Sequence, residues 1–227
     1  MNQLNMFAFG IYPYLAMAVM FIATWIRYDR EQYTWKTSSS QLLEKKQLRT
    51  GSILFHVGIL GIFFGHFFGL LMPKEVWYFF GVTTSMKQLV AMGAGGLFGV
   101  ICFVGLTILI QRRLFNPRIR ATSKPMDIVI LLLIYAQLIL GLLSIIVSTG
   151  HLDGAEMVRL MTWAQGIMTF NVAVAVDAIS EVHWIFKLHV VLGMTLFLLF
   201  PFTRLVHMLS VPLQYITRQH QVVRQRR

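Results

Sequence analysis

The chain has 227 residues, of which 56% are hydrophobic and 13% are charged, and its mean hydropathy is +0.66. Soluble domains are about half apolar and about a quarter charged, so this composition excludes an ordinary soluble domain and predicts a membrane protein. The net charge of +11 would suggest nucleic-acid binding in a soluble protein. Here the basic residues lie in the gaps between apolar runs, which indicates membrane topology and no nucleic-acid partner.

Five apolar stretches are long enough to cross a bilayer, whose core of about 30 Å requires roughly 20 residues of helix. They are 4–26, 50–72, 88–111, 127–148 and 184–211. We therefore predict an all-α fold, a single polytopic membrane domain over 1–227 with five transmembrane helices. The small residues at 16–18 resemble a signal-peptidase site, but no Lys or Arg precedes them and the apolar run continues to Trp25, so we expect the first span to be retained.

The gap 149–183 separates the fourth and fifth predicted spans and is too polar to cross the membrane. Within it, 155–170 carries apolar residues at helical spacing: Met157, Leu160, Met161, Ala164, Ile167 and Met168. This pattern fits a helix that lies along the membrane interface, and it fits a solvated loop equally well.

Lys and Arg are unequally distributed between the two ends of the predicted spans. Segments 27–49 and 112–124 carry six and five of them, and the tail 212–227 carries four. The opposite end carries Lys74, Lys87, Arg159 and Lys187. Because positively charged loops remain in the cytoplasm, we predict a bacterial inner-membrane protein with its N-terminus outside and its C-terminus inside. The positive charge at this end has two explanations: it forms a docking surface for a partner, or it only reflects membrane topology and contact with anionic lipid.

Four histidines lie inside the predicted spans, His56 and His66 on the second, His189 and His207 on the fifth. Ionisable side chains in a membrane span are rare and indicate a functional site. An interhelical hydrogen bond would explain a single histidine. Two on each of two helices favour a ligand held between the helices.

Helical geometry orders these histidines. If 184–211 is one helix, His189 and His207 lie on the same face about 27 Å apart, whereas His183 lies about 120° away and is expected to be a boundary residue. Because the second and fifth spans run antiparallel, His56 is expected to pair with His207 near the cytoplasm, and His66 with His189 near the outside.

The two spans differ in the spacing of their histidines. His56 and His66 are about 15 Å apart along the second helix, against about 27 Å on the fifth. Tilted planes of the bound groups, helix crossing, or a bend at Pro201 between His189 and His207 could each absorb this difference, and the sequence does not choose among them.

Two facing imidazoles provide what a planar haem iron needs from a protein. Bare zinc would require three or four ligands, and no Asp or Glu lies at matching depth. Cys102 is the only cysteine and lies in an apolar run, so we expect it to be a packing residue. We predict two b haems, and because both axial positions of each iron are filled, their role is electron transfer.

Other residues support a haem site with less weight. Glycines on the second and third spans leave room for a flat macrocycle or for close helix packing: Gly58, Gly61, Gly65, Gly69, Gly95, Gly96 and Gly99. Ser52 lies four residues before His56, and Thr203 lies four residues before His207. The hydroxyl or carbonyl of each could accept the ring N–H of that histidine. Arg204 and Arg112 are candidate partners of haem propionates, although Arg204 could instead extend towards the headgroups.

Several strings in the sequence resemble one family, the gamma (cytochrome b) subunit of membrane-bound respiratory nitrate reductase. They are RYDREQYTW, FHVGILGIFFGHFFGLLMP, RRLFNPRIRAT, DGAEM, FKLHVVLGMTLFLLFPFTRLVHMLSVPLQYI and YITRQHQVVR. The likeness covers nearly the whole chain and is weakest over 171–183.

The resemblance implies a quinol-oxidising subunit with two b haems, the distal one held by His66 and His189 and the proximal one by His56 and His207. It implies a quinol site beside His66 to which Lys87 contributes, for menaquinol or ubiquinol from the membrane pool. It also implies two partners on the cytoplasmic face, an iron–sulfur beta subunit and a molybdenum alpha subunit that reduces nitrate. Electrons would pass from the distal to the proximal haem and on to these partners.

Three other functions remain open from the residues. A cytochrome b subunit of a hydrogenase or formate dehydrogenase would use the same haems. A transporter whose histidines relay protons, or a passive anchor with structural histidines, would be colourless.

Overall fold

The computed structural model describes residues 2–36, 40–150 and 152–210. The basic tail 212–227 therefore lies outside the described residues. Over the described part every regular element is a helix, and five helical segments are long and apolar enough to cross a membrane. The predicted all-α fold with five long apolar helices is confirmed.

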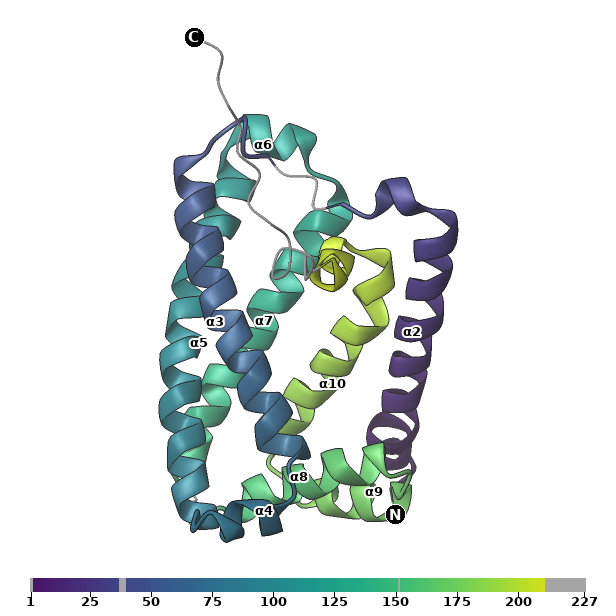
Figure 1. Ribbon diagram of the computed structural model, residues 1–227, viewed down its shortest axis with the longest axis vertical. Coiled ribbons are helices and arrows are strands. Elements are labelled where there is room, and N and C mark those ends of the chain that lie inside the picture. Colours follow the sequence, from purple (N-terminus) through teal and green to yellow (C-terminus); the bar gives the residue numbers. More distant parts are fainter. Residues whose placement is uncertain (1, 37–39, 151, 211–227) are drawn as a thin grey trace, which may run out of the picture.

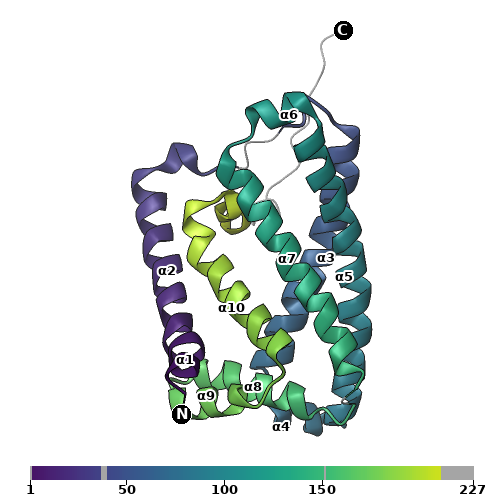
Figure 2. The ribbon, with the colours of Figure 1, turned by 180° about the vertical axis from the view of Figure 1, so that it is seen from behind.

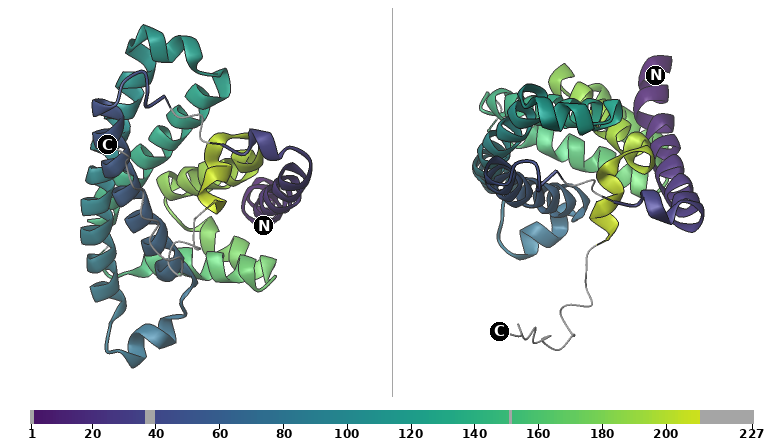
Figure 3. Two further views of the ribbon diagram at one scale, coloured as in Figure 1. Left: turned by 45° about the horizontal axis from the view of Figure 1, so that its top comes forward. Right: turned by 90° about the horizontal axis from the view of Figure 1, so that it is seen from above.

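Four of the five membrane-crossing segments are the long helices α2 with its N-terminal turns, α3, α5 and α7. The first runs Gln3–Arg30 and comprises α1 (Gln3–Asn5), η1 (Met6–Ile11) and α2 (Tyr12–Arg30); the others are α3 (Lys46–Leu71), α5 (Thr84–Phe115) and α7 (Pro125–Ser148). Each contains the corresponding predicted stretch apart from one or two residues at its edges. The α3 and α5 helices pack side by side at one edge, α2 stands at the opposite edge, and α7 lies between them (Figures 1 and 3).

The fifth segment is interrupted, and the prediction of one helix over 184–211 was wrong. The α10 helix (Trp184–Leu199) ends before Pro201, and two 3₁₀ segments follow, η3 (Phe200–Phe202) and η4 (Arg204–Leu209). Proline has no N–H to donate to the carbonyl four residues earlier, and its ring clashes there, so it ends the α-helix. Of the three explanations left open for the unequal spacings, the one at Pro201 is present, as a break in the helix and not as a bend.

The interruption leaves backbone carbonyls that a neighbouring helix satisfies. The Arg27 guanidinium on α2 donates to the carbonyls of Pro201 at 2.5 Å and Thr203 at 2.9 Å. Thr203 is buried, and its Oγ1 accepts from Leu205 N, which caps η4. Carbonyls without partners are costly in hydrocarbon, so Arg27 fixes the position of the broken segment.

Short helices cover the end of the bundle where the N-terminus lies. These are α4 (Lys74–Phe79), α8 (Ala155–Met168) and α9 (Val172–Ser180), which run across the ends of the long helices (Figures 1 and 2). Of the two interpretations left open for 155–170, the helix is correct. One face of α8 is buried against the bundle, including Met161, Trp163 and Ile167.

At the opposite end, two short elements join the long helices. These are η2 (Gln32–Thr34), which follows α2, and α6 (Pro117–Thr122), which links α5 to α7. The Asn116 side chain caps α6 by accepting from Arg118 N and Ile119 N. Pro125 begins α7, a position where the missing N–H costs nothing.

A proline also shapes the first segment. Pro13 cannot donate to the carbonyl of Phe9, and the buried Trp163 Nε1–H of α8 donates to that carbonyl at 3.0 Å instead. The backbone just before it, Met6–Ile11, forms a π-helical turn. This contact anchors α8 to the first segment and closes the bundle end.

Candidate functional site

The two predicted histidine pairs are brought together between α3 and the fifth segment. The ring centres of His56 and His207 are 6.3 Å apart, and those of His66 and His189 are 6.1 Å apart. The α-helix is interrupted after Leu199, between His189 and His207, and both pairs are in close contact across the two segments. The expected pairing is therefore present, while the role of the pairs as haem ligands stays a prediction.

Three of the histidines donate a hydrogen bond from Nδ1 to a backbone carbonyl of their own segment. His56 Nδ1 donates to Ser52 O at 2.7 Å, His66 Nδ1 to Ile62 O at 2.8 Å, and His207 Nδ1 to Arg204 O at 2.6 Å. Because a carbonyl oxygen only accepts, the proton lies on Nδ1 and the lone pair on Nε2. Each of these rings thus presents a metal-binding nitrogen.

The acceptors follow from the local helix type. In the α-helical α3 the acceptor is four residues before the histidine, and Ser52 provides the carbonyl as predicted, with its Oγ 3.2 Å from His56 Nδ1. In the 3₁₀ segment η4 the acceptor is three residues before, so Arg204 O replaces the Thr203 group that the sequence suggested. Thr203 instead caps the segment.

His189 differs from the other three. Its Nδ1 is buried and has no hydrogen-bond partner among the described residues. Its surroundings come from α7, where Gln137 Nε2 lies 3.3 Å from His189 Nε2 and 3.0 Å from the His189 carbonyl. Gln137 was not among the predicted site residues, although an amide inside an apolar span is a signal for interhelical bonding.

The geometry of the pairs fits a bis-histidine haem. Two metal–imidazole bonds of about 2 Å, with each ring centre about 1 Å beyond its nitrogen, place ring centres roughly 6 Å apart. The pairs measure 6.3 and 6.1 Å. No group of three or more His, Cys, Asp or Glu able to hold a bare metal ion exists among the residues described. The donor set therefore suits a ligand that brings its own equatorial nitrogens.

The glycines divide into two classes. A Cβ at Gly58 would lie 2.5 Å from Cys102 N, and one at Gly61 would lie 2.4 Å from the Phe98 ring, so these two glycines serve close packing of α3 on α5. A Cβ at Gly65 or Gly69 would meet no atom within 4 Å. These two open positions flank His66, and room there for a flat group stays a prediction.

Lys87 lies near the start of α5 and is only 7% exposed. Its ammonium donates to Gly69 O at 2.8 Å and to Met161 Sδ at 2.9 Å, and it lies 4.8 Å from the centre of the Trp77 ring. A small pocket adjoins it, and Lys87, Trp77 and Met161 are part of the pocket's lining. Trp77 Nε1 is buried with no hydrogen-bond partner within the described ranges.

The two arginines proposed for propionates have protein partners. Arg112 is 3% exposed and donates to the Glu44 carboxylate and carbonyl and to the Ser40 hydroxyl and carbonyl, which ties the segment before α3 to the end of α5. Arg204 lies 3.7 Å from Asp127 Oδ1, and Arg113 lies 3.6 Å from Asp127 Oδ2. A propionate role stays a prediction for both, and the geometry leaves more net positive charge beside Arg204.

His183 is the boundary residue that the sequence indicated. It precedes α10, and its Nδ1 accepts from Ile185 N at 3.3 Å. Cys102 is fully buried against α3, in agreement with a packing role.

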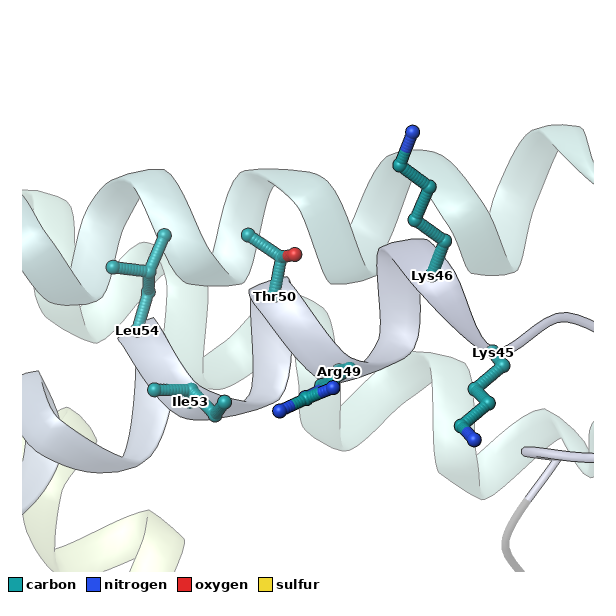
Figure 4. Close-up of a pocket in the computed structure, with 6 residues that line it drawn as sticks. All are labelled: Lys45, Lys46, Arg49, Thr50, Ile53 and Leu54. Atoms are coloured by element: carbon teal, nitrogen blue, oxygen red, sulfur yellow. The ribbon is translucent and has the colours of Figure 1, made fainter.

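A basic groove of about 520 Å³ lies at the other end of α3 (Figure 4). Its lining combines three cations with apolar side chains: Lys45, Lys46, Arg49, Thr50, Ile53 and Leu54. This end is the one predicted to face the cytoplasm.

Comparison with known proteins gives the family. The sequence pattern of the nitrate reductase gamma subunit family matches residues 5–226. The chain belongs to this family. It is 53% identical over 229 residues to respiratory nitrate reductase 1 gamma chain and 50% identical over 226 residues to respiratory nitrate reductase 2 gamma chain, both of Escherichia coli K12. These alignments cover all of this chain and 100% and 99% of the two relatives.

A more distant member of the nitrate reductase gamma subunit family shows the same coverage. The nitrate reductase gamma chain of Bacillus subtilis is 38% identical over 217 residues, which is 96% of each chain. The chain is thus a multi-pass membrane subunit of a respiratory nitrate reductase, and the resemblance found in the sequence is confirmed.

Proposed function

We propose that this chain binds two b haems, a proximal one between His56 and His207 and a distal one between His66 and His189, and transfers electrons from quinol to cytoplasmic subunits. The observation that carries the proposal is the spacing of the pairs, 6.3 and 6.1 Å between ring centres. When bound, each haem accepts and donates one electron at a time. The chain's part is to present four imidazole nitrogens and to hold the haems apart.

Quinol binds beside His66 at the pocket that adjoins Lys87. Oxidation of one quinol to quinone releases two electrons and two protons, and the protons leave towards the outside. Lys87 donates a hydrogen bond to a quinol oxygen, which displaces Met161 Sδ because a thioether is the weakest of the acceptors around the ammonium. Gly69 O keeps the lysine oriented.

The opposite end receives the partners. An iron–sulfur beta subunit docks on the basic surface that includes the groove at Lys45, Lys46 and Arg49 (Figure 4), and it passes electrons to a molybdenum alpha subunit that reduces nitrate. The N-terminus lies outside and the C-terminus in the cytoplasm of a bacterial inner membrane. With this orientation, electrons pass from the outer side of the membrane to the cytoplasmic side.

His66→Tyr tests the proposal in membranes that contain the complete complex. We expect loss of the distal haem, retention of the proximal haem, and loss of nitrate reduction driven by a quinol analogue. Reduction driven by a soluble dye that feeds the catalytic subunits directly should continue. Undiminished quinol-driven turnover in this variant would contradict the scheme.

A further inference from the structure

Two guanidiniums meet one carboxylate at the end of the bundle where α6 joins α5 to α7 (Figure 2). Asp127 of α7 has its Oδ2 3.6 Å from Arg113 Nη1 of α5 and its Oδ1 3.7 Å from Arg204 Nε of η4. The Asp127 side chain is 14% exposed, and those of Arg113 and Arg204 are 11% and 22% exposed. Charges with so little access to water are screened weakly by solvent and salt, so they act over longer distances than surface charges.

The carboxylate of Asp127 is held in place by the start of its own helix. Its Oδ2 accepts from Lys124 N at 3.2 Å, in the first turn of α7, which begins at Pro125. An acidic side chain is favoured there, because the N–H groups and the dipole of the helix give this end a partial positive charge. Arg113 Nη1 also donates to Ser123 Oγ at 2.9 Å. The position of Asp127 therefore depends on α7 as well as on the two arginines.

Arg204 connects this cluster to a histidine of the proximal pair. The η4 segment is a 3₁₀-helix, in which side chains three residues apart are eclipsed, so Arg204 and His207 project from the same side of it. The Arg204 carbonyl also accepts from His207 Nδ1 at 2.6 Å. The guanidinium that Asp127 pairs with thus belongs to the residue that orients the His207 ring.

We propose that Asp127 lowers the reduction potential of the proximal haem by offsetting the positive charge of the two guanidiniums beside His207. This inference rests on the proposed haem pairs. With two neutral imidazole ligands, an oxidised b haem centre carries one more positive charge than a reduced one, so positive charge nearby favours the reduced form. Asp127 sets one negative charge against the two positive charges of its partners. The lower potential makes the proximal haem a readier donor to the next electron carrier.

Asp127→Asn removes the charge and keeps the shape, and its amide oxygen can still accept from Lys124 N. In the purified complex, a redox titration followed by the low-spin electron paramagnetic resonance signals should show a higher potential for the proximal haem. A unit charge on the order of 10 Å away, at an effective dielectric constant of about 20, changes an equilibrium constant by about tenfold. For one electron this is a shift of about 59 mV. The distal potential should shift much less, because His66 lies about 15 Å from His56 along α3.

Variants of opposite charge separate this electrostatic role from a packing role. Arg113→Gln removes a positive charge from the same cluster and should lower the proximal potential. The double variant Asp127→Asn with Arg113→Gln restores the net charge and should return the potential towards the wild-type value. Asp127→Glu keeps the charge and should also titrate like the wild type. Asp29→Asn, at an exposed acid of the same end, is the matched control and should leave both potentials unchanged.

The outcomes distinguish the role of Asp127 from the proposed haem pairs. His66→Tyr should lose one haem and so identify the remaining signal as the proximal one; if it retains both haems, the proposed pairs are wrong. If the pairs are correct, an unchanged proximal potential in Asp127→Asn refutes the role of Asp127, and so do shifts of the same sign in Asp127→Asn and Arg113→Gln. If Asp127→Asn lost the proximal haem, Arg113→Gln would decide, because an unchanged or raised potential there also refutes this role.

Discussion

Lys87 is the residue whose position most constrains the quinol site. From the residues alone, Lys87 would be an ordinary lysine at the membrane interface. In the structure its side chain is buried against Gly69 O, Met161 Sδ and the Trp77 ring. A buried ammonium with one weak acceptor can exchange that acceptor for a ligand oxygen at little cost. Lys87 contacts Gly69, three residues after His66 on α3, which supports the proposed quinol site.

Lys87→Met should lower quinol-driven nitrate reduction by at least about tenfold, because a hydrogen bond from a charged donor contributes about 1.5–3 kcal/mol. Both haems should remain bound. Steady-state rates with a quinol analogue and with a soluble dye distinguish the site from the electron path. Arg159→Met, at an exposed cation of the same end that does not line the pocket, should retain nearly full activity; equal losses in the two variants would argue against a specific role.

Glu44 connects the segment before α3 to Arg112, and its contribution to the stability of the fold depends on pH. Hydrogen bonds from Gln47 N and from the Arg112 guanidinium hold the pKa of Glu44 below its ordinary value of 4.5. A lowered pKa in the folded state means that the carboxylate stabilises the fold above pH 4.5 and that this contribution disappears as pH falls through the folded-state pKa.

Thermal unfolding in detergent at several pH values tests this sign. Glu44→Gln should unfold at a lower temperature than the wild type at pH near 7, and the difference should shrink as pH falls below 4.5 and disappear once it is below the folded-state pKa of Glu44. Glu181→Gln, at an exposed glutamate of the other end, should show no comparable pH-dependent difference. If the difference in unfolding temperature between Glu44→Gln and the wild type increased as the pH was lowered, the proposed role of the carboxylate would be wrong.

At the scale of elements, the break in the fifth segment determines the site. Pro201 ends α10, and the 3₁₀ segment that follows brings His207 level with His56. Arg27 supports this segment because one of its guanidinium nitrogens donates to two carbonyls of the segment, those of Pro201 and Thr203. The proximal pair therefore depends on α2, a helix that carries no histidine ligand.

Arg27→Met should weaken binding of the proximal haem while the distal haem stays bound, because two carbonyls of the broken segment lose their charged donor. Haem content and redox-difference spectra of the purified complex provide the measurement. Arg30→Met, at an exposed arginine one turn later, is the matched control and should resemble wild type. Retention of a wild-type proximal signal in Arg27→Met would show that η3 and η4 hold their position without α2.

The sequence predicted the long helices and the pairing of histidines, because hydropathy and antiparallel order are local or nearly local properties. It did not predict that α10 ends at Leu199, since a proline in a membrane helix bends some helices and ends others according to which neighbours satisfy the freed carbonyls. It also missed Gln137, Asp127 and Trp77. Their roles arise from contacts between helices, which periodicity along one helix does not specify.

The glycines show the same limit. On sequence, room for a macrocycle and close helix packing were equally good explanations for the whole series. In the structure Gly58 and Gly61 face α5 directly, whereas Gly65 and Gly69 are open. Only the crossing of α3 with α5 separates the two explanations.

At the scale of the whole molecule, the two histidine pairs lie between the pocket proposed for quinol and the basic end. Along α3, His66 is nearer the end that contacts Lys87 through Gly69 O, and His56 is nearer the groove at Lys45 and Arg49 (Figure 4). The proposed order of quinol site, distal haem, proximal haem and docking surface follows the order of these residues along α3. A transporter or passive anchor would have no need of this order.

Haem quantitation with a reduced-minus-oxidised spectrum of the purified complex tests the central claim most directly. The account predicts two low-spin b haems per copy of this chain. A colourless preparation, or one with a single haem per chain, would contradict it.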